Sequence, residues 1–131
     1  MARVLLDTTV AIDVLKGRPR TTERFLALES RGDVPHVCAV TVEEVSAWLR
    51  PNERERASEM FEGLPTAPLG MAEGRLAGSW RQRYRRSGRT LSQADALIAA
   101  AAVGIGASLA TGNPKDFPID GLEVEHWPAG E

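Results

Sequence analysis

The sequence predicts a three-layer α/β/α protein with a central parallel sheet of about four to five strands. Short continuous apolar runs, typical of strands buried on both faces, recur along the chain. Segments with helical periodicity separate these runs, and strands that alternate with helices usually form one parallel sheet. The length of 131 residues fits a single domain that spans residues 1–131.

The expected strands are short and apolar. They cover residues 4–6, 34–40 and 108–110. Residues 65–69 are a candidate for a short edge strand, although Pro65 and Pro68 disfavour it. Leu122, Val124 and Trp127 suggest a final edge strand.

The expected helices begin at capping residues and end at glycine or proline. They cover residues 10–16, 22–30, 41–50, 53–62, 71–87 and 93–103. In the fifth helix, Leu76, Trp80 and Tyr84 recur at every fourth position and predict one buried stripe. The sixth helix is apolar on nearly every side, which predicts a central position.

Composition excludes several classes of protein. Apolar residues make up 43% of the chain, enough for a core, and the net charge of −2 argues against a general DNA-coating protein. The single cysteine, Cys38, excludes an internal disulfide framework and fits a reducing cytosol. No apolar stretch suits a signal peptide or a membrane span. We therefore expect a soluble, cytoplasmic protein that does not bind a membrane.

Acidic and hydroxyl residues recur just after the expected strands, where parallel sheets bind their ligands. Asp7 follows the first strand, and Glu43 and Glu44 follow the second. Asp95 lies in the first turn of the central helix. The loop after residues 108–110 carries three more polar side chains, which are Thr111, Asn113 and Asp116.

Each acidic residue also has an explanation without function. Thr41 with Glu44, and Ser92 with Asp95, both match the capping box, a local hydrogen-bonding pattern at a helix start. A helix cap of this kind stabilises a protein by roughly 1 kcal/mol. The other acids assigned to solvated helix faces are Asp13, Glu23 and Glu43.

Together, these carboxylates point to a metal ion. Two carboxylates about 4 Å apart repel by roughly 4 kcal/mol at an effective dielectric constant near 20. Mg²⁺ or Mn²⁺, which takes all-oxygen ligands, would relieve that repulsion, activate water and bind phosphate oxygens. The chain has no recognisable Ser-His-Asp or Cys-His set and no glycine-rich phosphate loop. Metal-assisted phosphodiester hydrolysis is therefore the predicted chemistry, and it requires Asp7, Glu44 and Asp95 to lie close together.

Four segments, in order, resemble those of PIN-domain proteins, specifically the VapC ribonuclease toxins of VapBC toxin–antitoxin pairs. They are LDTTVAID at residues 6–13, TVEEV at 41–45, ADALIAA at 94–100 and LATGNPKDF at 109–117. The resemblance covers essentially the whole chain and implies a PIN-like fold.

The resemblance also implies site residues for Mg²⁺- or Mn²⁺-dependent endonucleolytic cleavage of RNA. The implied catalytic and metal-binding residues are Asp7, Glu44, Asp95 and Asp116, and the accessory polar residues are Thr9, Thr111 and Asn113. Asp116 would bind a second ion or orient water. The chain departs from the family pattern at Gly112, where a larger and often basic residue is common, and at Pro114.

The partners implied by the resemblance are an RNA substrate, a VapB-type antitoxin that blocks the acidic pocket, and a second copy of the chain in a homodimer. Three alternatives remain open. They are a non-catalytic PIN-fold binding module, a nuclease that acts on DNA, and a phosphoacceptor signalling domain. The last would need a lone aspartate after a central strand, which we do not find.

Residues 80–89 contain five arginines and no acid. They would suit phosphate contacts that an acidic site cannot make. A solvated helix face opposite the Leu76–Trp80–Tyr84 stripe is the preferred explanation for most of them. Arg89, which is close in sequence to Asp95, is the expected RNA-binding residue.

Overall fold

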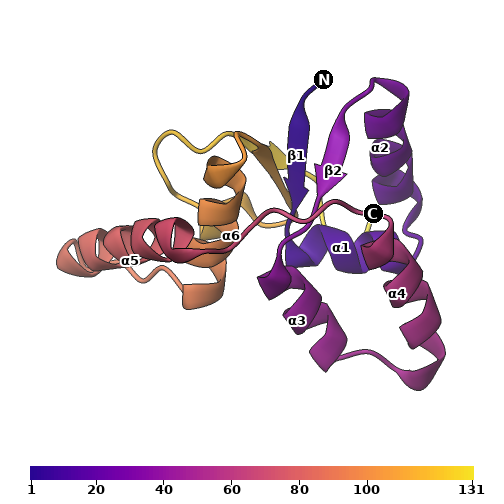
Figure 1. The fold of residues 1–131 in the computed structure, drawn as a ribbon, viewed down its shortest axis with the longest axis horizontal. Helices are drawn as coiled ribbons and strands as arrows, with labels where there is room; N and C mark the ends of the chain where they lie inside the picture. The colour runs from indigo at the N-terminus through magenta and orange to yellow at the C-terminus, as the bar shows by residue number, and fades with distance from the viewer.

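The computed structural model describes all 131 residues and contains one parallel sheet of four strands. In chain order, the strands are β1 (Arg3–Leu6), β2 (Val34–His36), β3 (Ser108–Thr111) and β4 (Val124–His126). They lie in the order β2-β1-β3-β4, so β1 and β3 are central (Figure 1). In the register, Leu5 of β1 lies opposite both His36 and Leu109. The predicted parallel sheet of about four to five strands is therefore confirmed.

Six α-helices surround the sheet. They are α1 (Thr8–Leu15), α2 (Pro19–Ser30), α3 (Ala39–Ala47), α4 (Arg54–Glu62), α5 (Met71–Arg86) and α6 (Gln93–Gly104). Two short 3₁₀ turns cover Pro51–Glu53 and Pro114–Asp116. None of the helices combines the length and the apolar character that a bilayer span requires.

Alternating residues of β1 belong to two separate cores, as the two faces of a strand require. Leu5 packs in a cluster with residues of α5 and α6, whereas Val4 and Leu6 pack in a second cluster with residues of α1 and α2. The helices therefore form one layer on each face of the sheet, which is the predicted three-layer arrangement.

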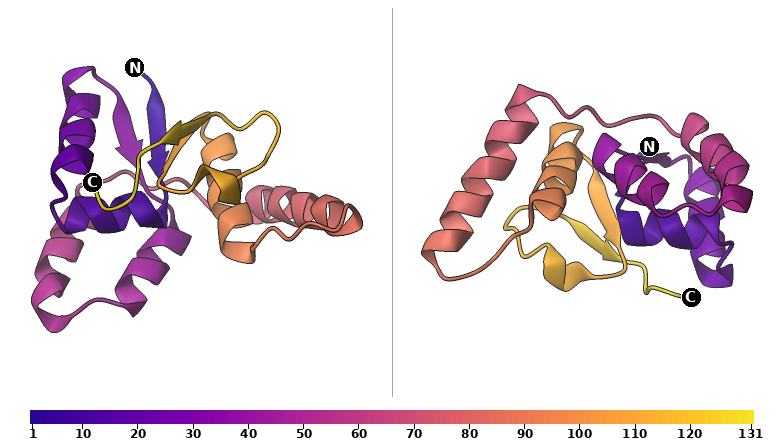
Figure 2. Two further views of the ribbon diagram at one scale, coloured as in Figure 1. Left: turned by 180° about the vertical axis from the view of Figure 1, so that it is seen from behind. Right: turned by 90° about the horizontal axis from the view of Figure 1, so that it is seen from below.

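The fifth and sixth helices pack against each other on one side of the molecule. In α6, every residue from Ile98 to Ala102 is buried, as its apolar sequence predicts. Trp80 of α5 is buried against this cluster, with Leu76 and Tyr84 partly buried beside it, so the predicted stripe is confirmed. The other side of α5 faces solvent, and the helix forms one flank of the molecule (Figures 1 and 2).

The predicted strand at residues 34–40 is wrong in its second half. Pairing with β1 ends at His36, and Val37 pairs instead with Thr66 in a single isolated bridge. The helix α3 then begins at Ala39, two residues before the predicted start. The apolar run looked continuous because Val37 and Cys38 are both buried, although neither belongs to the sheet.

The edge-strand candidate at residues 65–69 is reduced to the same bridge. The Val37 N–H donates to the Pro65 carbonyl at 3.1 Å, and the Ala67 N–H donates to the Val37 carbonyl at 2.8 Å. Proline at positions 65 and 68 removes two donors, so no longer ladder forms.

Candidate active site

Asp7 lies at the point where β1 ends and α1 begins. Its side chain is the N-cap of α1, because Oδ1 accepts a hydrogen bond from the Val10 N–H at 3.0 Å. The Thr9 hydroxyl donates to the same oxygen at 2.6 Å, and the Thr111 hydroxyl of β3 donates to Oδ2. Asp7 is only 4% exposed. Burial raises the pKa of its carboxyl group, although these hydrogen bonds act in the opposite direction.

The loop after β3 is joined to Asp7 by further hydrogen bonds. The Gly112 N–H donates to Thr9 Oγ1 at 2.8 Å, and the Asn113 N–H donates to Thr111 Oγ1 at 3.0 Å. Both threonines that bind the Asp7 carboxylate are therefore held by backbone amides of this loop. This network fixes the orientation of Asp7 more tightly than a helix cap alone requires.

A side chain at position 112 would be crowded by its neighbours. A Cβ at this position would lie 3.1 Å from Thr9 Oγ1 and 3.1 Å from the Ala129 Cβ. The C-terminal segment thus fills the space beside Gly112. That packing gives a structural reason for the departure from the family pattern at residue 112.

Glu44 belongs to α3 and points toward α1. The Thr8 hydroxyl donates to Glu44 Oε1 at 2.6 Å and lies 3.3 Å from Thr41 Oγ1. The capping-box explanation for Glu44 is therefore wrong. Because α3 begins at Ala39, Thr41 is buried inside the helix and cannot cap it.

Asp95 lies in the first turn of α6, where Ser92 is the N-cap, as predicted. The other half of the predicted capping box, a hydrogen bond from the Ser92 N–H to the Asp95 carboxylate, does not form. The Asp95 N–H donates to Ser92 Oγ at 3.1 Å. Partial burial raises the pKa of the Asp95 carboxyl group, and the Ser92 hydroxyl acts in the opposite direction. The negative charges of Asp116, Glu44 and Asp7 raise that pKa further.

Asp116 ends the 3₁₀ turn Pro114–Asp116, and the Asn113 side-chain amide donates to its Oδ2 at 2.8 Å. Asp95 lies within the electrostatic field of the other three acids, so the structure brings all four predicted carboxylates to one end of the sheet. We call this set the acidic rim, defined by Asp7, Glu44, Asp95 and Asp116. It lies beyond the carboxyl ends of the strands, as the topology predicts.

The acidic rim suits a divalent ion in its donor chemistry, although its members do not form a closed ligand set. No three His, Cys, Asp or Glu side chains are positioned to ligate a single ion. Mg²⁺ usually keeps several of its waters and binds only one or two protein carboxylates directly. All the donor atoms in the rim are carboxylate oxygens, which Mg²⁺ and Mn²⁺ prefer. The negative charges of three of these carboxylates disfavour ionisation of the fourth, Asp95. The rim therefore fits Mg²⁺ or Mn²⁺ held partly through water.

Two residues outside the rim were also singled out in the sequence, and the structure places one of them differently from the prediction. Asp13, predicted on a solvated face, is buried, and its Oδ2 accepts a hydrogen bond from the Gly130 N–H at 2.8 Å. Helical periodicity cannot reveal a C-terminal segment that returns across the helix. Arg89 is exposed, and its guanidinium lies 5.0 Å from the centre of the Tyr84 ring.

Sequence analysis missed two residues that support the rim. Thr8 orients Glu44, and Gly112 makes room for Thr9. A hydroxyl directly after Asp7 is a signal that could have identified Thr8. The role of Gly112 depends on contact with Ala129 and has no local signal.

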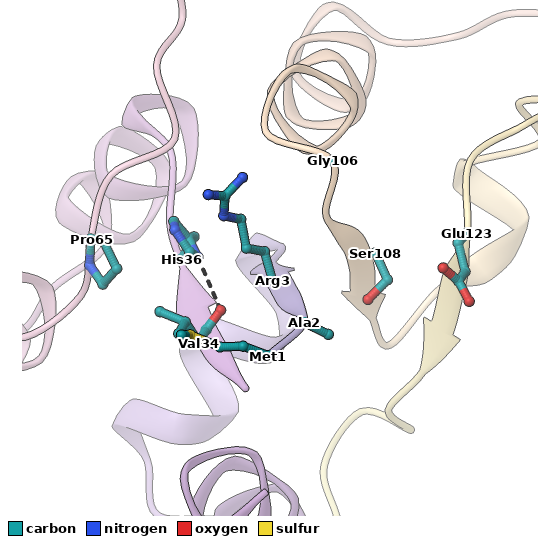
Figure 3. Close-up of a pocket in the computed structure, with 9 residues that line it drawn as sticks. All are labelled: Met1, Ala2, Arg3, Val34, His36, Pro65, Gly106, Ser108 and Glu123. Carbon is teal, nitrogen blue, oxygen red and sulfur yellow. Dashed lines mark hydrogen bonds between the residues drawn. The ribbon is translucent and has the colours of Figure 1, made fainter. Parts of the chain in front are cut away.

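Two hollows near the sheet differ in position. One of ≈ 340 Å³ lies between α3 and α6 and includes Glu44, so it opens directly beside the acidic rim. Another of ≈ 590 Å³ lies at the amino ends of the strands, where Arg3, His36, Ser108 and Glu123 line it (Figure 3). The second contains none of the predicted site residues.

Comparison with known proteins agrees with this fold. The model of the PIN domain family matches residues 4–118. The chain therefore belongs to the PIN-domain family. Within that family its relatives are VapC proteins. Ribonuclease VapC19 of Mycobacterium tuberculosis is 30% identical over 115 residues, which are 88% of this chain and 92% of that protein. Ribonuclease VapC10 of the same organism is 28% identical over 116 residues, 88% of this chain and 86% of that protein.

Solved structures give the same fold. A chain of VapBC2 from Rickettsia felis, crystallised with a DNA fragment from its promoter, superposes with a TM-score of 0.83 at 19% identity, covering 95% of this chain and 98% of that one. A chain of DNA-bound VapBC from Salmonella typhimurium superposes with a TM-score of 0.81 at 24% identity, covering 97% of this chain and 99% of that one. The three-layer arrangement is therefore the PIN-like fold.

Proposed function

We propose that this protein is a metal-dependent endoribonuclease that acts as the toxin of a toxin–antitoxin pair. The observation that carries the proposal is the acidic rim, in which the buried carboxylate of Asp7 is held by residues of α1 and β3 and other acids lie nearby. Such an arrangement costs stability unless a cation offsets the charge. The relatives named ribonuclease supply the substrate class.

The rim residues have distinct roles in this proposal. Asp7, Glu44 and Asp95 would hold Mg²⁺ or Mn²⁺ in part through waters on the ion, and Asp116 would hold a second ion or orient water. When bound, the ion lowers the pKa of water and neutralises charge that develops on the phosphate.

The remaining steps belong to the chain itself. Thr9, Thr111 and the Val10 N–H fix both oxygens of Asp7, and Thr8 fixes Glu44. The Asn113 amide holds one oxygen of Asp116, which leaves the other free to accept a hydrogen from the attacking water. Water serves as the nucleophile, so the ribose 2′-hydroxyl is not needed for attack.

The proposed partners follow from the solved relatives, which are described as VapBC toxin–antitoxin assemblies. We infer that a VapB-type antitoxin binds this chain and that the chain forms a homodimer. Trp48 is 87% exposed and lies at an apolar hollow between α1 and α3, which supports a protein partner at that surface. Light scattering of the chain alone and with its antitoxin would measure both assemblies.

A cleavage assay tests the function directly. Purified protein is incubated with labelled RNA and labelled DNA of the same sequence, in EDTA and after addition of Mg²⁺ or Mn²⁺. We expect cleavage of RNA only, and only with the metal. Cleavage of DNA would favour the DNA nuclease, RNA binding without cleavage would favour the non-catalytic module, and cleavage that persists in EDTA would refute the metal role.

A further inference from the structure

The C-terminal half of α5 carries a concentration of positive charge that the acidic rim does not explain. Residues 74–94 contain six arginines and no acid, in a chain whose net charge is −2. Four of them are exposed around the end of the helix, and we call these the arginine surface: Arg83, Arg85, Arg86 and Arg89.

These arginines have no acidic partners. The only ion pairs in the structure join Arg24 to Glu131 and Arg31 to Asp33. The exposed helix α4 behaves differently, because Arg54 and Arg56 there alternate with glutamates. The arginine surface is therefore a region of uncompensated charge of one sign.

Solubility and helix capping explain this surface only in part. Cations in the last turn interact favourably with the helix dipole. However, Arg83 and Arg86 are neighbours on the helix surface at a spacing of three residues, so their charges repel. A bound polyanion would remove that repulsion.

Two hydrogen bonds from side chains of α5 next to the arginine surface reach the segments that carry the acidic rim. The Tyr84 hydroxyl donates to the carbonyl of Pro118, two residues after Asp116. Arg89 stacks over the same Tyr84 ring. Arg81 Nε donates to the Leu91 carbonyl at 3.2 Å, directly before Ser92, which caps the helix of Asp95.

The acidic rim needs such a neighbour if it acts on RNA. Four carboxylates repel phosphates, and a metal ion neutralises them only at the bond that is cut. The phosphates on either side of that bond require cations from elsewhere in the protein. Seen from below, α5 lies beside α6, the helix that carries Asp95 in its first turn (Figure 2, right).

We propose that the arginine surface of α5 binds the phosphates of the RNA strand that is cut at the acidic rim. This inference rests on the proposed function, because it assigns the binding surface for the same substrate. An acidic protein segment is the competing occupant. RNA is favoured because the surface is attached to the segments of Asp95 and Asp116 and would continue the path of a strand that crosses the rim.

Binding measured without cleavage tests the inference. The probe is a fluorescein-labelled single-stranded RNA of about 20 nucleotides, titrated by anisotropy in EDTA across a range of salt concentrations. The variant carries Arg83→Ala with Arg86→Ala. Each lost phosphate contact should reduce the slope of log affinity against log salt by about 0.7, so two should reduce it by about 1.4. At low salt we expect affinity to fall about tenfold.

A matched control makes the same change of net charge elsewhere. Arg18 and Arg20 are both exposed near the start of α2, on the side of the molecule opposite α5 (Figure 1). Arg18→Ala with Arg20→Ala should leave the slope unchanged. Replacing Arg83 and Arg86 by lysine should preserve it, and circular dichroism should show equal folding of all variants.

Several outcomes would overturn the inference. A slope equal to that of the unmodified protein would do so, as would an equal loss in the control variant. Unchanged RNA binding with lost binding of a poly-glutamate peptide would assign the surface to an acidic protein partner. If the unmodified protein cleaves RNA with Mg²⁺ while the arginine variant binds RNA normally, only this inference fails. If the unmodified protein neither binds nor cleaves RNA, the proposed function fails as well.

Discussion

The two ends of the parallel sheet differ in the size of their hollows and in how firmly their polar side chains are held. At the amino ends of the strands lies a hollow of ≈ 590 Å³, larger than the ≈ 340 Å³ hollow beside Glu44. The polar side chains that line it make separate hydrogen bonds, each to a different residue: Arg3 to the Ile105 carbonyl, His36 to the Val34 carbonyl and Ser108 to Glu125. At the carboxyl ends, by contrast, Asp7 alone accepts three hydrogen bonds that join β1, α1 and β3.

The larger hollow contains none of the four predicted carboxylates, so hollow size and the predicted site do not coincide in this fold. A carboxylate that stays buried and well oriented, within the field of other acids, has a structural cost that an empty hollow does not have. The carboxyl end therefore carries the stronger functional signal.

The largest expected effect comes from removing the charge of Asp7. In Asp7→Asn the side chain keeps its shape and can still accept hydrogen bonds from Val10 and Thr9, but it no longer attracts a divalent ion. We expect Mg²⁺-dependent RNA cleavage to fall at least about 100-fold, since even changes to residues that support a metal ligand cost 10–100-fold.

His36→Ala at the amino end is the matched control. It alters the larger hollow and should change the cleavage rate by less than about twofold. A folded Asp7→Asn variant with normal activity, or an equal loss in His36→Ala, would reverse the comparison of the two ends.

Gly112→Ala should have a smaller effect on both stability and activity. The new methyl group would meet Thr9 Oγ1 and Ala129 at 3.1 Å and push apart the contacts that orient Asp7. We expect unfolding free energy to fall by about 1–3 kcal/mol and cleavage to fall about tenfold.

Gly78→Ala is the control for this change, because nothing lies within 4 Å of a Cβ there. Within α5 it should stabilise the protein by about 0.5–1 kcal/mol and leave cleavage unchanged. Denaturant titrations measure the stabilities. Equal behaviour of the two alanine variants would contradict the role assigned to Gly112.

Asp95→Asn should raise the melting temperature in EDTA at neutral pH. Burial and neighbouring acids raise the pKa of this carboxyl group in the folded state above its unfolded value. The protein therefore loses stability as pH rises from the unfolded pKa through the higher folded pKa. The asparagine variant avoids that loss. Its advantage should disappear below the unfolded pKa near 3.8 and should shrink when Mg²⁺ is added. An advantage of equal size in acid would show that charge is not the cause.

Asp33→Asn, at the amino end of the sheet, should lower the melting temperature at neutral pH, opposite to the change expected for Asp95→Asn. This change should be the smallest of the four. The Ala2 N–H donates to Asp33 Oδ1 at 3.0 Å, and this hydrogen bond lowers the pKa of the carboxyl group. Ionised Asp33 therefore stabilises the fold above its unfolded pKa, and the contribution is lost as pH falls through the lower folded pKa. Thermal melts at neutral and acid pH should show a decrease for the variant only at neutral pH.

The sequence predicted those features that depend on local patterns. Asp7 follows a short buried strand, and Ser92 precedes a helix with an acid three residues later, so the cap of α6 was recognisable. The alternation of strands and helices then placed Asp7 and Asp95 at the same end of a parallel sheet, before any distance was known.

Features that depend on contacts between distant segments were not predictable in this way. Residues 34–40 form one apolar run, yet the chain leaves the sheet at His36 and enters a helix at Ala39. That shift of two residues moved Thr41 into the helix and freed Glu44 to bind Thr8. Likewise, Asp13 is buried only because the segment around Gly130 returns to cover it.

The double role of Asp7 has a consequence for the motions of the first turn of α1. Asp7 Oδ1 accepts hydrogen bonds from the Val10 N–H and the Thr9 hydroxyl, and Thr9 in turn accepts one from the Gly112 N–H. Loading the rim with Mg²⁺ would therefore slow amide hydrogen–deuterium exchange at Val10 and Gly112, which are 102 positions apart along the chain. These two amides would serve as built-in reporters of ion occupancy, readable without any substrate.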